Sequence, residues 1–436
     1  MLSLVLIVFH IALGFAIASS SVIAMIWCGA ILLLGLSRII RSKNQNDEAM
    51  LWSAYIAAAD VPLRACGGAL LWDIGKWGVM LFLIIGLLVS KKKVSIPLLA
   101  TSIFILILPG VISTFSWSDN VREALTFNIS GMMCLIVSLI YFFKRTISYY
   151  SLKEIFSYSL MPIVVLSIVL FYRTPSLDSI TFESSANFAT SGGFGPNQVA
   201  TILGYGWLIV LVMIYLKQKV TSNTIITYGL FLFLLYRSLF TFSRGGNFAA
   251  ILAFVCFFFF YSSSHHIKDK SSKSLVTLLL VGVMGFGIVL SIDSVTEGMF
   301  SNRFTGRDSS GEKREDITTG RNDILMLEYE LFKDHPLGVG VGGSRYYRLS
   351  QFDDDHASHN EFGRLLSEHG IFGLAVILIM LISPLSFSRK LPDAENKAFC
   401  LMFYVLCVAS MMHSGCRTAI PEFLYGLSFI YLTPRT

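Results

Sequence analysis

Seven arginines and a closely spaced pair of histidines gather in one polar segment, at about residues 293–368, between two long apolar runs. The arginines are Arg303, Arg307, Arg314, Arg321, Arg345, Arg348 and Arg364, and the histidines stand in His356-Ala357-Ser358-His359-Asn360-Glu361. A guanidinium group presents a planar fork of donors that matches phosphate oxygens, and it stays charged. A histidine can accept a proton near neutral pH. The segment is therefore equipped to hold an anionic group and to move a proton beside it.

Two arginines that precede this segment are further candidates for binding an anion. Arg244 stands in Ser243-Arg244-Gly245-Gly246, where the glycines allow a backbone or a ligand to come close. Arg237 lies seven residues earlier, which predicts a place two helical turns deeper on the same face. An arginine at a helix end often reaches to the membrane surface, and that alternative stays open for Arg244. A charged side chain as deep in the membrane as Arg237 marks a functional interior or an ion pair. Arg244 and Arg237 are therefore both candidates for substrate binding.

His359 is the candidate general base, because a neutral imidazole can remove a proton from a sugar hydroxyl. His356, three residues earlier, is the alternative base and a candidate binding residue. The run Asp353-Asp354-Asp355 before it also permits a metal site or a solvated acidic turn. Because the surrounding arginines oppose a cation, we expect no metal and no cofactor.

The composition places the chain among polytopic membrane proteins. Of its 436 residues, 54% are hydrophobic and 14% are charged, and the mean hydropathy is +0.67. The seven cysteines are scattered, without a CxxC pair, and indicate small buried side chains. The net charge of +6 reports membrane orientation, and nucleic-acid binding gains no support from it. An anion held at a membrane surface would then be a lipid-linked phosphate.

The apolar runs predict an all-α bundle of about 12–14 transmembrane helices, since a bilayer core needs about 20 apolar residues per helix. The runs fall near 2–19, 22–40, 50–65, 71–90, 94–116, 124–143, 155–172, 198–216, 224–242, 246–262, 274–291, 369–387, 397–413 and 419–433. If each run crosses, six basic loops share one side, and the positive-inside rule makes that side and both termini cytoplasmic. The predicted organisation is residues 1–223, N-terminal helices; 224–388, a core with a large outer loop at 292–368; and 389–436, C-terminal helices.

The outer segments have recognisable local patterns. Residues 321–334 predict an amphipathic helix at the membrane face, with Thr318 or Thr319 as N-cap. The glycines of 338–343 predict a flexible turn, and 360–366 predict a short helix that continues toward the next span. Other ionisable residues could line a cavity or form structural ion pairs: Asp60, Arg64, Asp73, Lys76, His413 and Arg417.

Four motifs in order resemble the O-antigen ligase and O-antigen polymerase superfamily over about residues 225–380. They are Thr241-Phe-Ser243-Arg244-Gly245-Gly246, Gly320-Arg321, His335-Pro-Leu-Gly338-Val-Gly340-Val-Gly342, and His359-Asn360-Glu361-Phe-Gly-Arg-Leu-Leu366-Ser-Glu368-His-Gly370-Ile-Phe-Gly373. Gly195-Pro196-Asn197-Gln198 resembles an upstream motif of the same group. The resemblance implies a metal-independent lipid glycosyltransferase with a bundle-type C fold.

The resemblance also implies a site and its ligands. Arg244 and Arg321, with Arg303, would bind the pyrophosphate of an undecaprenyl-pyrophosphate-linked glycan donor, and Asn197 joins the expected substrate-binding residues. His359 would be the base. The acceptor would be a glycan or lipid A core, and the location the bacterial inner membrane, with the site at its periplasmic face. Ligase and polymerase remain alternatives, and a polysaccharide transporter or flippase is the competing class.

Overall fold

The computed structural model describes residues 2–91, 95–115, 121–176, 179–180, 182–183, 185–262, 271–314, 320–352 and 358–433. These residues form α1 (Leu4–Ser19), α2 (Ser21–Ser42), α3 (Glu48–Ala65), α4 (Ile74–Val89), α5 (Leu98–Thr114), α6 (Val121–Phe142), β1 (Thr146–Ile147), α7 (Tyr149–Arg173), α8 (Pro196–Tyr215), α9 (Thr224–Leu239), α10 (Arg244–Ser262), α11 (Ser271–Val295), α12 (Met299–Thr305), α13 (Arg321–Asp334), α14 (Gly343–Phe352), α15 (Glu361–Ser388), α16 (Ala394–Ser414), α17 (Ile420–Leu427) and β2 (Tyr431–Leu432). The prediction of an all-α polytopic membrane protein is confirmed.

Helix length and apolar composition decide which elements can cross a bilayer. Among the described residues, seven helices are long and apolar enough to do so, or eight if the bent pair formed by residues 281–295 and α12 is one span. With four shorter apolar helices, α1, α4, α5 and α9, the total is eleven, or twelve with the bent pair, which is the lower end of the predicted range. Helix α3 forms as predicted, but it carries the buried pair Asp60–Arg64, whose side chains lie 3.3 Å apart.

Contacts between chain segments show which helix ends lie together. At one end, Leu2 donates its N–H to Val220, Lys153 donates to Gln218, and the short strands β1 and β2 pair in parallel. At the other end, Arg173 donates to the carbonyl oxygens of Ala18 and Ala65. The described basic loops around β1 and residues 217–219 therefore lie beside both chain ends, as the alternation of spans predicts.

The last apolar run departs from the prediction of a full transmembrane helix. Helix α17 has eight residues, and at 1.5 Å per residue it covers about 12 Å of a core that is about 30 Å thick. It still returns the chain to the basic end, because Gly131, in the middle of α6, packs against Cys416. After α17, Phe429 accepts a hydrogen bond from Lys144 N–H at 2.8 Å. The loop between α16 and α17 is thus recessed into the bundle.

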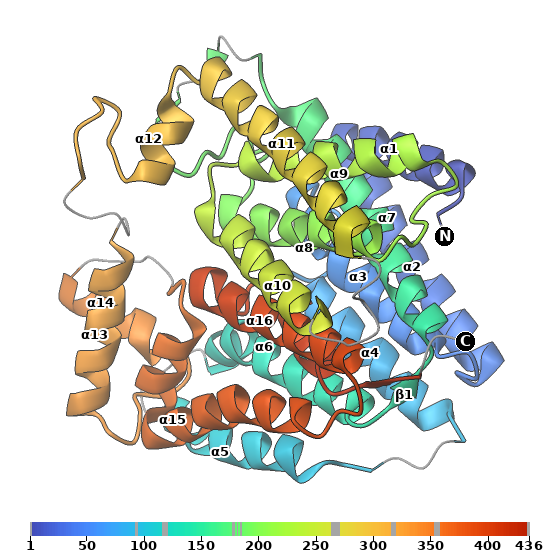
Figure 1. Ribbon diagram of the computed structural model, residues 1–436. Coiled ribbons are helices and arrows are strands. Elements are labelled where there is room, and N and C mark those ends of the chain that lie inside the picture. The colour runs from blue at the N-terminus through green and yellow to red at the C-terminus, as the bar shows by residue number, and fades with distance from the viewer. Residues whose placement is uncertain are drawn as a thin grey trace.

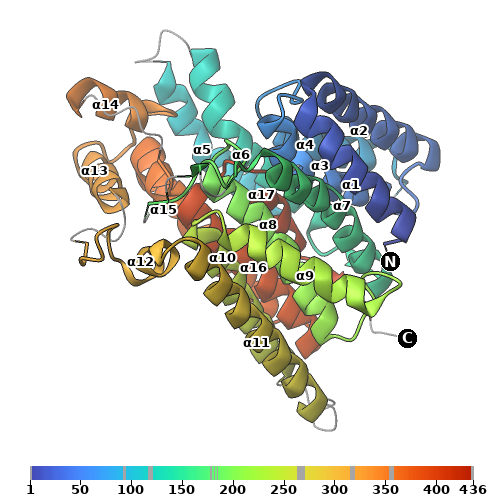
Figure 2. The same ribbon diagram turned by 90° about the horizontal axis from the view of Figure 1, so that it is seen from above.

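The long polar segment builds helices at the end of the bundle opposite the termini. Figure 1 shows α12, α13 and α14 on that side, and Figure 2 shows the same separation from above. The predicted helix 321–334 is confirmed with its bounds. Its N-cap is Gly320, with a φ of +77°, and not a threonine; Thr318 and Thr319 lie outside the described residues. Helices α12 and α14 were not predicted.

The glycine motif at 338–342 is bound to the neighbouring helix instead of forming the predicted flexible turn. Helix α15 is interrupted at Gly370, where φ is +59° and ψ is −135°. At this break, Pro336 accepts a hydrogen bond from Ile371 N–H at 2.9 Å, and Val339 and Gly340 donate to carbonyls of the same helix. A side chain at Gly338 would collide with that backbone, so glycine is required there. The predicted helix after residue 360 is confirmed as the first half of α15.

The arrangement of ends predicts a labelling result. A cysteine placed at Ser309, in the exposed turn after α12, should react with an impermeant thiol reagent in cells with a permeabilised outer membrane. A cysteine placed at the exposed Lys219 should stay unlabelled until the cytoplasmic membrane is also opened. Reversed labelling of the two positions would overturn the orientation and move the site to the cytoplasmic face.

Candidate active site

A cavity of about 670 Å³ lies where α8, α10, α12 and α13 meet the start of α15. Five of the residues singled out in the sequence line it: Asn197, Arg244, Arg303, Arg321 and His359. They come from segments separated by more than 160 positions in the chain (197 to 359), and the fold brings them together around one cavity. The structure thus assembles the predicted site residues, while their roles in chemistry stay predictions.

Arg244 is positioned by a reversal of the chain between α9 and α10. The turn is fixed by Asn247, which accepts from Ser238 Oγ at 2.8 Å and donates to the carbonyl oxygen of Ser243 at 3.1 Å. Ser243 Oγ in turn donates to Asn197 at 2.8 Å, so the motif at 195–198 and the Ser-Arg-Gly-Gly motif form one unit. Arg244 is the first residue of α10 and donates to the carbonyl oxygen of Arg303 at 3.2 Å.

The glycines after Arg244 serve helix packing and lie inside α10. A side chain at Gly245 would collide with the His413 ring, and one at Gly246 would collide with the backbone of Ala200. Close approach of a neighbouring backbone was one of the two expected uses of these glycines. Their small size lets α10 press against α8 and α16, which sets the position of the Arg244 guanidinium.

Three guanidinium groups share the cavity. Arg303 is buried in α12, and Arg321 begins α13 next to the cavity. Burial, and then the charge of Arg244, lower the pKa of Arg321. Like charges in a partly dry space are unfavourable unless an anion joins them. Among the described residues that line this cavity, the only acidic side chain is Glu328.

His359 is held in a short turn before α15. Asn360 caps the helix by accepting from Phe362 N–H at 3.0 Å, which is a favourable N-cap arrangement. Ser358 Oγ donates to the carbonyl oxygen of Asn360, and Arg417 donates to the carbonyl oxygen of Ser358 at 2.7 Å. With the backbone fixed on both sides, His359 lines the cavity together with the arginines.

One predicted site residue, Arg237, is not brought into this cavity. Arg237 is buried in α9, not on the helix of Arg244, because the chain reverses between them. Its guanidinium donates to Thr174 Oγ1 at 2.8 Å and to the carbonyl oxygen of Thr190 at 3.2 Å, which is a structural role. His356 and the aspartates before it lie outside the described residues. Within the described part of the chain, no group of three or more His, Cys, Asp or Glu side chains is placed to hold a metal ion.

Glu328 is a site residue that the sequence reading missed. It is fully buried in α13, lines the cavity, and lies 3.5 Å from Arg348. A side chain at Gly363 would collide with its carboxylate, so glycine makes room for it. Burial raises its pKa to about 7, although Ser358 and Arg348 oppose the shift. Its signal in the sequence was an acidic residue on the buried face of an amphipathic helix, in line with Ile324 and Leu331.

The raised pKa of Glu328 predicts a pH dependence of stability. A carboxyl group with a folded-state pKa near 7 and an ordinary value of 4.5 favours the folded protein most below pH 4.5. That contribution is lost as the pH rises from 4.5 to about 7, and it stays lost at higher pH. The loss is about 3 kcal/mol, at about 1.36 kcal/mol per pKa unit. Relative to Glu328→Gln, the wild-type melting temperature in detergent should fall from pH 5 to 7 and then level off. A constant difference across this range would contradict the shift.

Most of the remaining lining of the cavity is apolar, and Asn322, Ser358 and Asn360 are its polar members. Phe248 and Ile251 of α10, Phe304 of α12, and Ile324 and Leu325 of α13 face the space. Phe248, Ile251 and Phe304 are exposed. The cavity therefore combines a cationic wall with an apolar wall that continues onto the exposed surface of α10, a candidate membrane span, which suits a ligand with a charged head and an apolar tail.

This fold and site define an all-α membrane protein with an arginine- and histidine-lined cavity at one face. Residues 229–378, which contain Arg244, Arg303, Arg321 and His359, match the family model described as O-antigen ligase. This domain match supports the resemblance to the O-antigen ligase superfamily that the motifs indicated, and it supports an O-antigen ligase- or polymerase-like membrane glycosyltransferase. No curated protein matches the chain.

Proposed function

We propose that the protein transfers a glycan from an undecaprenyl-pyrophosphate-linked donor to a sugar hydroxyl at the periplasmic face of the bacterial inner membrane. The observation that carries the proposal is the convergence of Arg244, Arg303 and Arg321 with His359 on one cavity whose other wall is apolar. In this orientation the basic loops and both termini are cytoplasmic, and the outer helices α12 to α14 are periplasmic.

The donor fits the two walls of the cavity. Its polyprenyl tail would lie along the apolar wall and leave between α10 and α12, where Phe248 and Phe304 are exposed. Its pyrophosphate would lie among the three guanidinium groups, which can each donate two parallel hydrogen bonds. Binding of the anion would also relieve the repulsion among these cations, so the site is suited to a pyrophosphate more than to a neutral sugar.

The proposed reaction is a single displacement at the anomeric carbon of the donor glycan. His359 removes the proton of the acceptor hydroxyl, the oxygen forms a bond to the anomeric carbon, and the bond from that carbon to the pyrophosphate oxygen breaks. The electron pair leaves with undecaprenyl pyrophosphate, and the arginines stabilise the charge that develops on it. The step needs no protein nucleophile, cofactor or metal ion. His356 is the alternative base in this scheme.

A ligase and a polymerase would share this chemistry and differ in the acceptor, which is lipid A core for one and a second lipid-linked repeat for the other. A gene deletion read on a lipopolysaccharide gel separates them. Loss of all polymer from the core is expected for a ligase, and a band with a single repeat is expected for a polymerase. An unchanged pattern of both lipopolysaccharide and other surface polysaccharide would contradict the proposed function.

A further inference from the structure

A second cavity, of about 270 Å³, adjoins the arginine–histidine cavity. Ser358 lines both spaces, His359 and Asn360 line the first, and Glu361 lines the second. The same happens in α8, where Asn197 faces the first cavity and its neighbour Gln198 faces the second. The candidate base therefore lies on the partition between the two spaces, one residue from the wall they share.

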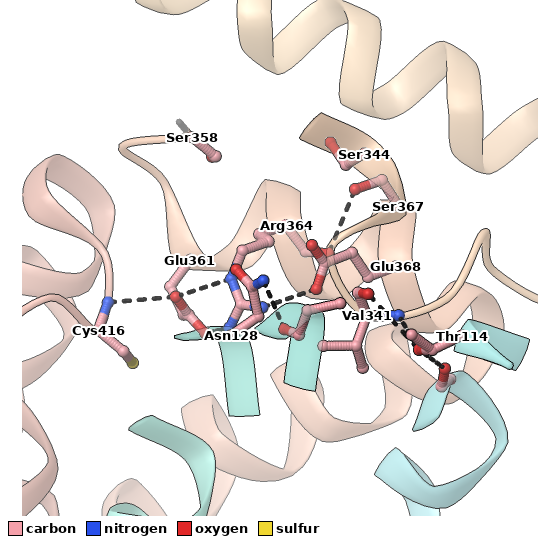
Figure 3. A network of polar contacts seen from close by, with 12 residues as sticks. Thr114, Asn128, Val341, Ser344, Ser358, Glu361, Arg364, Ser367, Glu368 and Cys416 are labelled. Carbon is pink, nitrogen blue, oxygen red and sulfur yellow. Dashed lines mark hydrogen bonds and ion pairs between the residues drawn. The ribbon is translucent and has the colours of Figure 1, made fainter. Parts of the chain in front are cut away.

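The second cavity is lined by charge and differs in this from the first. Six cationic side chains line it, Arg64, Lys76, Arg345, Arg348, Arg364 and Arg417, against three acidic ones, Asp73, Glu361 and Glu368. Each of these three acidic side chains forms an ion pair with a cationic side chain of the same set. Arg364 lies between Glu361 and Glu368, as Figure 3 shows, and Lys76 lies 3.2 Å from Asp73. Among the described lining residues the cations exceed the acids by three (six minus three). Arg64 and Arg348 also pair with Asp60 and Glu328, which lie outside this lining, and the remaining excess of one positive charge (six minus five) favours an anionic occupant.

The walls of the second cavity are rigidly built. Arg64 donates to Gln198 at 2.5 Å and to the carbonyl oxygen of Arg417 at 2.8 Å, and it also forms the buried pair with Asp60. Cys416 N–H donates to Glu361 at 3.2 Å, which joins the recessed loop between α16 and α17 to the start of α15 (Figure 3). A network with these partners holds its shape before a ligand arrives, which lowers the entropy cost of binding.

Aromatic and amide groups complete the lining. Trp72 and Phe127 are both more than half exposed, at 56% and 51%, and the Arg64 guanidinium stacks on the Trp72 ring at 5.5 Å. Asn128 and Gln198 supply donors and acceptors. A pyranose ring has apolar C–H faces and a polar rim of hydroxyls, so aromatic rings beside amides and charges suit it. The volume, just below the about 300–1,000 Å³ of typical small-molecule sites, suits one sugar residue.

We propose that this second cavity is the acceptor site and that it binds a sugar residue carrying a carboxylate or a phosphate. The proposal rests on the proposed function, since it takes the neighbouring cavity as the donor site. The acceptor would enter past Trp72 and Phe127, hold its anionic group among the arginines, and present a neighbouring hydroxyl across Ser358 to His359. Acceptors without an anionic group would bind weakly, so the cavity would select the acceptor.

Binding of simple sugars to the purified full-length protein in detergent tests the proposal. Glucuronic acid, glucose 6-phosphate, glucose and inorganic phosphate serve as probes; the sugars are read by saturation-transfer NMR and inorganic phosphate by the broadening of its ³¹P signal. We expect one or both anionic sugars to bind at least about tenfold more tightly than glucose, the effect of one added charge-assisted hydrogen bond. The two anionic sugars distinguish a carboxylate from a phosphate. Equal binding of glucose and both anionic sugars would overturn the proposal.

Three variants locate the probe. Arg345→Gln, at an exposed position of the second cavity, should weaken the anionic sugars by about tenfold. Trp72→Ala should weaken the anionic sugars and leave inorganic phosphate unchanged. Arg321→Gln, in the first cavity, should leave sugar binding unchanged.

If Trp72→Ala has no effect and phosphate binds as well as glucose 6-phosphate, the site binds an anion and not a sugar. If Arg321→Gln abolishes probe binding and Arg345→Gln does not, the probe occupies the donor site, and the proposal fails.

Binding of undecaprenyl pyrophosphate by the same proteins separates this proposal from the proposed function. The wild type and Arg345→Gln should both bind the lipid, and Arg321→Gln should bind it more weakly. If no protein binds the lipid, the proposed function fails whatever the sugars do. Lipid binding without any preference for anionic sugars would leave the donor site standing and refute the acceptor site alone. Equal melting temperatures of the variants would exclude misfolding as the cause.

Discussion

Arg244→Lys is expected to lose most transfer activity although it keeps the positive charge. A lysine ammonium is a point charge and cannot form the two parallel hydrogen bonds of a guanidinium with a phosphate. Losing one hydrogen bond to a charged group, worth about 1.5–3 kcal/mol, corresponds to a rate lower by about 10- to 100-fold. The measurement is the transfer rate of purified protein with a lipid-linked donor, corrected for the amount of folded protein.

Arg307→Lys is the matched control for this variant. Arg307 is an exposed arginine of the same outer segment and donates to the carbonyl oxygen of Gly311 within its own turn. It does not line the first cavity. Its replacement should leave the rate unchanged. Full activity in Arg244→Lys would return Arg244 to the class of arginines that reach to the membrane surface without binding substrate.

His359→Ala is expected to lower transfer by about 10²–10⁴-fold, the usual cost of losing a general base, with protein level and donor binding nearly intact. The imidazole is assigned to proton removal, and the arginines are assigned to holding the pyrophosphate. His356→Ala should have a milder effect if that residue only shapes the loop. A chelator should affect neither protein, because the proposed step uses no metal ion. Rates and donor affinities are measured on the same preparations.

His335→Ala is the control for His359→Ala, since His335 is an exposed histidine at the end of α13 and does not line the first cavity. An active His359→Ala together with an inactive His356→Ala would move the base three residues earlier, to His356. Loss of wild-type activity on adding a chelator would instead assign the Asp353 to His359 segment to a metal, and the proposed displacement would be wrong.

The fold was predictable where it depends on local composition. Apolar runs located the long helices, and the basic loops indicated which helix ends lie on the same side. The spacing of Ile324, Leu327 and Leu331 predicted α13 with its bounds. The eight-residue α17 was not predictable, because the run at 419–433 is mostly apolar and long enough for a span. Only the recess of the loop before it, against Gly131, makes a full span unnecessary.

The site was predictable in its residues and less so in its geometry. Arg244, Arg321 and His359 were found from residue type and motif, since phosphate binding and proton removal demand these side chains. Arg237 was misplaced, because Arg244 begins α10 instead of ending the helix that carries Arg237. Arg64 and Arg417, which lie far apart in the chain, contributed nothing to the predicted site. Their meeting in the second cavity depends on packing of α3 against the recessed loop.

Transfer by the purified protein is the most direct test of the central claim. Wild-type protein in lipid vesicles would receive an undecaprenyl-pyrophosphate-linked glycan and an acceptor in the presence of a chelator. We predict formation of the glycosylated acceptor together with one equivalent of undecaprenyl pyrophosphate, and loss of both products in His359→Ala. Formation of product at the wild-type rate in His359→Ala and Arg244→Lys would contradict the assignment of the reaction to this cavity.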